Sequence, residues 1–120
     1  FISHCKEMPL AYSLADVVVS ASIEPEAFGR VAVESQSMGK PIIASNIGGS
    51  KETILNKKTG FLYKHDDPRE LAKNLNTVIQ LSQEELKLIG NEGRKNVSRK
   101  FDVELMCDSN LREYKKLFKK

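Results

Sequence analysis

The chain has 120 residues, of which 40% are hydrophobic and 29% are charged, and its formal net charge is +3. This length supports one domain with a single core and is too short for two, and the composition is that of an ordinary soluble protein. No apolar run approaches the roughly 20 residues that cross a bilayer, and the two widely separated cysteines argue against a disulfide scaffold or zinc site and favour a reduced, cytosolic chain.

Short apolar runs typical of buried strands alternate with a helical pattern in the first half of the chain. The runs at 17–20, 41–44 and 61–63 predict strands, and RVAVESQSMG, between the first two, predicts one helix closed by Gly39. A strand, a helix and a strand at this spacing indicate parallel strands joined by a right-handed crossover. The predicted fold class is α/β, with three core parallel strands and flanking helices.

From residue 67 onward the pattern is helical. Asp67 and Glu70 predict a capping box with proline at the first helical position, and Ser82 with Glu85 predicts a second box. A last helix capped by Asp102 is expected to carry one apolar stripe, formed by Cys107, Leu111, Tyr114 and Phe118. The basic residues gather in this last third, which favours a solvated helix face over an anion-binding surface.

Two glycine turns follow two of the predicted strands. Gly29 precedes the helix that contains Arg30, and Gly48 with Gly49 follows the next strand and opens a short helix. Because the carboxyl ends of parallel strands meet at one edge of a sheet, we expect both turns to aim backbone N–H groups at one crevice. Such a crevice suits an anion, with Arg30 as a source of positive charge.

A glutamate stands in the apolar stripe of the first predicted helix. Glu34 shares a helix face with Val31, Ser35 and Met38. Burying a carboxylate costs several kcal/mol unless the group is well hydrogen-bonded. We therefore expect Glu34 either to be paired inside the protein or to accept hydrogen bonds from the hydroxyl groups of a ligand. Taken singly, each of these features is more often plain loop chemistry or a glutamate paired with a nearby cation.

The ordered set is more specific: Glu26, seven residues, Glu34, then GKPIIAS, then GGSKE. It resembles the C-terminal half of the retaining glycosyltransferases of family 4, also called group 1, whose hallmark is E-x7-E. The stretches AYSLADVVVSAS and TGFLYKHDDPRELAKNL resemble the same family before and after this set. The resemblance implies the GT-B fold, in which two Rossmann-like domains face each other and the C-terminal domain holds most of the nucleotide-sugar donor.

Carried over to this sequence, the resemblance implies a catalytic role for Glu26 beside the donor sugar, where charge develops at the anomeric carbon. Phe28 and Gly29 would present backbone N–H groups near that sugar, with the helix start facing the diphosphate, and Glu34 would accept hydrogen bonds from the ribose. The implied donor-binding residues are Phe28, Gly29, Arg30, Glu34, Gly48 and Gly49. The resemblance implies no metal and no cofactor other than the donor substrate.

The resemblance also implies that residues 1–120 are part of a C-terminal domain whose first strands are missing. In a sheet ordered 3-2-1-4-5-6, residues 1–2 would belong to strand 3 and residues 17–20 to strand 4. Strand 4 would then have an open edge, which predicts strand exchange or oligomer formation. We expect a piece of a longer enzyme that is inactive by itself.

The predicted function is glycosyl transfer with retention, from a nucleotide-diphosphate sugar to a cell-envelope glycan or lipid acceptor such as lipopolysaccharide. The predicted location is the cytoplasm, at the inner face of the membrane, with the basic terminal helices near anionic lipid. Two alternatives stay open: a non-catalytic remnant or binding module that requires a partner chain, and a GT-B relative such as a nucleotide-sugar epimerase. Nucleic-acid binding is not predicted, because the basic tail lacks interleaved aromatic residues.

Overall fold

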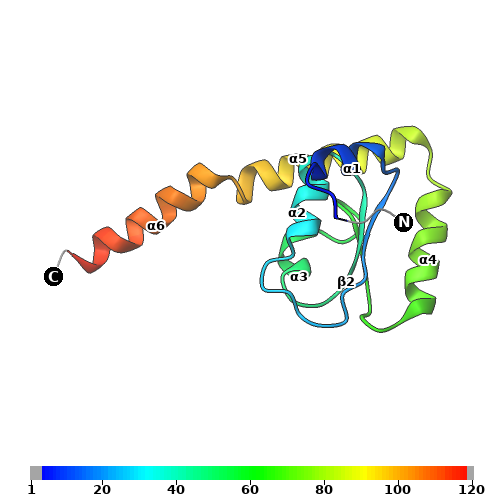
Figure 1. The fold of residues 1–120 in the computed structure, drawn as a ribbon, viewed down its shortest axis with the longest axis horizontal. Helices are drawn as coiled ribbons and strands as arrows, with labels where there is room; N and C mark the ends of the chain where they lie inside the picture. The colour runs from blue at the N-terminus through cyan, green and yellow to red at the C-terminus, as the bar shows by residue number, and fades with distance from the viewer. Residues whose placement is uncertain (1–3, 119–120) are drawn as a thin grey trace.

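The computed structural model describes residues 4–118 and shows a sheet between helices, with one long helix extending away from it (Figure 1). The elements in chain order are α1 (Met8–Leu14), β1 (Val18–Ser20), α2 (Arg30–Ser37), β2 (Ile42–Ser45), α3 (Ser50–Thr53), β3 (Phe61–Tyr63), α4 (Pro68–Ile79), α5 (Gln83–Lys100) and α6 (Val103–Leu117). Helix α1 was not predicted from the sequence.

The sheet is parallel and its strands lie in the order β1-β2-β3. Val18 is in register with Ile42, and Ile43 with Phe61. The predicted fold class and the parallel strands are confirmed, and each predicted strand is within one residue of its observed bounds. The predicted strand at residues 1–2 lies outside the described residues.

The two faces of the sheet are covered by different helices. Alternate residues of the fully buried strand β2 point to opposite faces, so Ile42 and Ala44 pack with Ala32 of α2, and Ile43 packs with Val78 of α4. Such burial on both faces is typical of a parallel sheet with crossover helices. The predicted apolar face of α4 is confirmed, because Val78 is buried with Ile43 and the partly buried Leu71 and Leu75 pack against this cluster.

Helix α5 packs closely against α2. A Cβ atom added at Gly90 would lie 2.1 Å from the carbonyl oxygen of Gly39, so the helices can approach this closely only at a residue without a side chain. Buried amides then join three helices: Gln36 donates to the carbonyl of Thr53 at 2.9 Å, and Asn96 donates to Gln36 at 3.1 Å and to Thr53 at 3.0 Å. These bonds fix α2, α3 and α5 relative to one another.

The helix caps partly confirm the predictions. Asp67 accepts hydrogen bonds from the next N–H groups of α4 at 3.0 and 3.1 Å, as expected of a cap. The prediction that Glu70 would bond back to the N-cap is wrong. Its carboxylate accepts a hydrogen bond from the backbone N–H of Lys64, in the preceding turn, instead. The second predicted box, formed by Ser82 and Glu85, is present in full.

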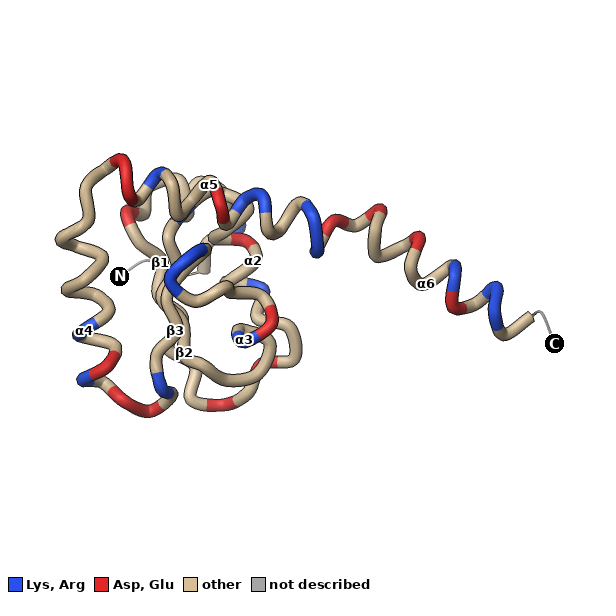
Figure 2. Tube along the Cα trace, turned by 180° about the vertical axis from the view of Figure 1, so that it is seen from behind, with Lys and Arg blue, Asp and Glu red and all other residues tan. Residues whose placement is uncertain are grey.

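Helix α6 extends away from the remainder of the structure (Figure 1). Asp102 caps it as predicted, and its apolar stripe, which includes Leu111 and Phe118, is exposed. The charged residues of α6 are acidic toward its start and mainly basic toward its end (Figure 2), so both signs of charge are present there. Among residues 4–118, none of the helices combines the length and the apolar character needed to cross a membrane.

Candidate functional site

The loops that follow β1 and β2 lie against each other at the carboxyl edge of the sheet. The backbone N–H of Gly49 donates to the carbonyl of Glu26 at 2.8 Å. A Cβ atom at Gly49 would lie 2.3 Å from the carbonyl carbon of Phe28, and one at Gly48 would lie 2.4 Å from the carbonyl oxygen of Glu26. Only glycine permits this contact. The structure therefore brings together the two turns that the sequence placed at one edge.

The first loop ends at a helix start with unpaired donors. Gly29 has a φ of 75° and a ψ of 59°, a left-handed conformation that other residues rarely adopt. Among the described residues, the backbone N–H groups of Arg30 and Val31 have no hydrogen-bond partner. An exposed helix start of this kind carries a partial positive charge and can bind an anion.

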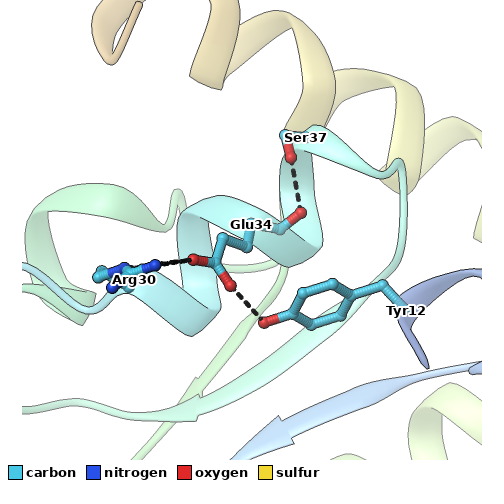
Figure 3. Close-up of polar contacts among 4 residues, drawn as sticks. All are labelled: Tyr12, Arg30, Glu34 and Ser37. Carbon is cyan, nitrogen blue, oxygen red and sulfur yellow. Dashed lines mark hydrogen bonds and ion pairs between the residues drawn. The ribbon is translucent and has the colours of Figure 1, made fainter. Parts of the chain in front are cut away.

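The Glu34 carboxylate is held from two sides (Figure 3). Its Oε1 accepts hydrogen bonds from Arg30, from Nη2 at 3.0 Å and from Nε at 3.2 Å, while its Oε2 accepts from the hydroxyl of Tyr12 at 2.9 Å. The Glu34 side chain is 34% exposed and that of Arg30 is 83% exposed. Glu34 is thus paired inside the protein and still reaches solvent. Arg30, which was expected to face an anion, lies against Glu34 in this structure.

Tyr12 is a site residue that the sequence analysis did not identify. It comes from α1, is 5% exposed, and reaches Glu34 across 22 positions of sequence. Burial, together with the hydrogen bond to Glu34 and the negative charge of that carboxylate, raises the pKa of Tyr12 to about 12. A buried tyrosine usually finds a partner for its hydroxyl. The presence of a tyrosine in an apolar stretch was therefore the sequence signal that could have pointed to Tyr12.

These side chains line a pocket of about 380 Å³ between α1 and α2. The lining residues are Lys6, Met8, Pro9, Tyr12, Arg30, Glu34, Ser37 and Met38. The pocket combines a carboxylate that accepts hydrogen bonds with two cationic side chains and the apolar side chains of α1. It can therefore accept a ligand that carries hydroxyl groups and negative charge.

The Glu26 side chain lies apart from this pocket, on the exposed loop after β1. Its carboxylate accepts a hydrogen bond from the hydroxyl of Ser22. Two residues further along, the Phe28 ring packs edge to face against Phe101, with ring centroids 5.5 Å apart and an interplanar angle of 76°. Phe101 ends α5, so the last turn of that helix supports the loop that leads to Gly29. This contact between residues 73 positions apart was not predicted from the sequence.

A larger cavity of about 700 Å³ lies between β3, α4 and α5, and none of the predicted site residues lines it. Two of its polar side chains already have a structural role. Asn56 accepts a hydrogen bond from the backbone N–H of Leu62 at 2.9 Å, and Asn74 donates to the carbonyl of Leu62 at 3.3 Å. These amides satisfy the outer edge of β3, so we place the candidate site at the loops and the α1–α2 pocket instead.

A family profile, a curated relative and solved structures each match most of this chain. The profile of the family described as glycosyl transferases group 1 matches residues 1–96. The chain is 30% identical to spore coat protein SA of Bacillus subtilis (strain 168) over 112 residues, which are 92% of this chain and 29% of that protein.

Solved structures extend the comparison. A glycosyltransferase from Rickettsia africae ESF-5 is 41% identical with a TM-score of 0.86, covering 91% of this chain and 29% of that one. HepE from Anabaena, in complex with UDP-glucose, is 29% identical with a TM-score of 0.89, covering 97% of this chain and 32% of that one. The chain thus spans at most 32% of the length of these three proteins.

Proposed function

Because this chain belongs to the glycosyl transferases group 1 family and has the fold of its GT-B structures, we propose that it supplies the donor-binding part of a sugar-transferring enzyme. The donor would be a nucleotide-diphosphate sugar. One structural neighbour, HepE, forms a complex with UDP-glucose, which supports a donor of this class.

The observation that carries the proposal is the Glu34 carboxylate, which lines the α1–α2 pocket. A carboxylate only accepts hydrogen bonds, and ribose offers two neighbouring hydroxyl groups as donors. Glu34 is partly exposed, so a ribose can reach it without unfolding the helix. Glu34 would therefore bind the ribose of the donor nucleotide, as the family resemblance implies.

The remaining site residues would serve the diphosphate and the sugar. The unpaired N–H groups at the start of α2 suit the negative charge of the diphosphate, which grows as the bond to the sugar breaks. Phe28 and Gly29 would face the sugar, and Gly48 with Gly49 would keep their loop in place. Glu26 would act beside the anomeric carbon, where an exposed carboxylate can stabilise positive charge.

The finer parts of the proposal are supported by the sequence resemblance. They are retention of configuration, chemistry without a metal cofactor, a cell-envelope acceptor and a cytoplasmic location at the membrane. The acceptor would bind mainly outside the 120 residues, since the chain spans 29% of the B. subtilis relative. We therefore expect the chain alone to bind the donor without transferring the sugar.

Nucleotide titration tests the proposal. UDP, GDP and ADP would each be added to the 15N-labelled chain, and the amide signals of Gly29, Arg30 and Glu34 would be followed. We expect shifts centred on these residues that are lost in Glu34→Gln and kept in the control Glu84→Gln, an exposed glutamate on α5. A folded chain that shows no shifts with any of the three at millimolar concentration would refute donor binding.

A further inference from the structure

The two partners of the Glu34 carboxylate differ greatly in how firmly they are held. Arg30 is 83% exposed and lies one helical turn before Glu34, in an ion pair of the i,i+4 kind. Tyr12 is 5% exposed and approaches from a separate helix. Exposed ion pairs of this kind are weak and exchange readily with water, whereas a buried aromatic ring has few alternative positions.

We propose that Tyr12 is a positioning residue for Glu34, and that the donor nucleotide replaces Arg30 on this carboxylate while Tyr12 stays in place. This inference rests on the proposed function, because it concerns how the same carboxylate accepts the ribose. Tyr12 touches neither nucleotide nor sugar in this account. It holds Oε2 of Glu34 and so fixes the direction in which Oε1 faces the pocket.

The position of Tyr12 is set without help from Glu34. Lys40, which precedes β2, donates a hydrogen bond from Nζ to the carbonyl of Ser13 at 2.9 Å and so ties down the end of α1. The Tyr12 ring is buried among its neighbours, and its raised pKa keeps the hydroxyl protonated at any physiological pH. Tyr12 is therefore a permanent donor to Oε2 of Glu34.

The Arg30 side is the one that a ligand can enter. Oε1 of Glu34 accepts two hydrogen bonds from the guanidinium, at 3.0 and 3.2 Å, in the place where two neighbouring ribose hydroxyls would donate. Movement of Arg30 toward the pocket mouth would expose that oxygen and bring a positive charge to the diphosphate. Arg30 would then pair with Glu34 in the free protein and with the diphosphate in the complex.

The test compares a nucleotide with its analogue that lacks both ribose hydroxyls. Dissociation constants would be measured by calorimetry for UDP, GDP or ADP, whichever binds most tightly, and for the matching 2′,3′-dideoxy nucleotide. The ratio of the two constants reports only the contacts of the ribose hydroxyls. We expect the wild-type chain to prefer the natural nucleotide by on the order of tenfold, as hydrogen bonds to a charged acceptor allow.

The variants separate positioning from packing. Tyr12→Phe removes only the hydroxyl and should lower the ratio to about threefold or less, whereas the control Tyr63→Phe, at a buried tyrosine of β3, should keep the wild-type ratio. Arg30→Ala should keep or increase the ratio, even if overall affinity falls. The Nε–H signal of Arg30 in the wild-type chain should shift more with the natural nucleotide than with the dideoxy analogue.

The outcomes distinguish the inference from the function beneath it. If the wild-type chain binds none of the three nucleotides, the proposed function fails and the inference falls with it. If it binds with ribose preference and Tyr12→Phe keeps that preference, only the positioning role of Tyr12 is wrong. A ratio that falls in Arg30→Ala, or an Arg30 signal that does not respond, would overturn the exchange at Oε1.

Discussion

Gly49→Ala is expected to damage both the stability of the chain and its donor loop. Gly49 has a φ of −61° and a ψ of −22°, which suit alanine, so the backbone conformation adds no strain. The cost is steric, because the new Cβ would lie 2.3 Å from the carbonyl carbon and 2.4 Å from the carbonyl oxygen of Phe28. The two loops must move apart by about 1 Å to reach an ordinary van der Waals separation.

The magnitude follows from the contacts that this movement breaks. Overpacking of this kind costs about 1–3 kcal/mol, and loss of the 2.8 Å bond from Gly49 to Glu26 costs about 1 kcal/mol. Alanine recovers about 0.4–1 kcal/mol by restricting the unfolded chain. The net loss is about 1–4 kcal/mol, which lowers the melting temperature by roughly 4–15 °C in a chain of this length.

Thermal unfolding followed by circular dichroism would measure this change, and nucleotide titration would measure the effect on the site. We expect binding to weaken by about tenfold, since a displaced Phe28 carbonyl moves the start of α2 and weakens a hydrogen bond to the phosphates. The control is Asn91→Ala, at an exposed position of α5, whose melting temperature should stay within about 4 °C of wild type. Gly49→Ala with wild-type melting and binding would show that the two loops do not depend on their contact.

Three further predictions concern helices around the site. Gly90→Ala should lower the melting temperature by about 4–12 °C, because its Cβ would meet a backbone carbonyl at 2.1 Å that no side-chain movement relieves; unchanged melting would place α5 further from α2 than described. Phe101→Ala should weaken nucleotide binding several-fold, because it removes the ring that packs against Phe28. The control Leu111→Ala, on the exposed α6, should leave binding unchanged, and equal effects of the two variants would refute the specific role of Phe101. The raised pKa of Tyr12 stabilises the fold below about pH 10 and ceases to do so as the pH rises toward 12, so urea unfolding of Tyr12→Phe should lose part of this alkaline dependence.

Local sequence patterns predicted the features of this fold that depend on neighbouring residues. Short apolar runs predicted the strands. Helix caps were predicted at Asp67, Ser82 and Asp102, because a cap involves residues only two or three positions away. The reciprocal half of the first capping box failed because the backbone N–H of Lys64, in the incoming turn, competes for Glu70. Local pattern does not reveal such competition.

The partners of the site residues were less predictable, because they come from distant positions. An Arg30–Glu34 pair follows from i,i+4 spacing on a helix, although the sequence analysis assigned Arg30 to an anion. Tyr12 reaches Glu34 only through the packing of α1, a seven-residue helix too short to be stable by itself or to show a clear period. Phe101 meets Phe28 only after four helices and two strands have intervened in the chain.

Helix α5 contains none of the predicted site residues, yet it contacts α2 near both of its ends. Arg94 donates from Nε to the carbonyl of Ser37 at 3.0 Å, at the last turn of α2, and Phe101 packs on the ring of Phe28 just before the first turn. Between these points the buried amides join the two helices, and Gly90 approaches the backbone of Gly39 just beyond the end of α2. The direction of α2, and with it the direction of its unpaired N–H groups, is therefore determined mainly by α5. It follows that substitutions along α5 can alter nucleotide binding without touching the nucleotide.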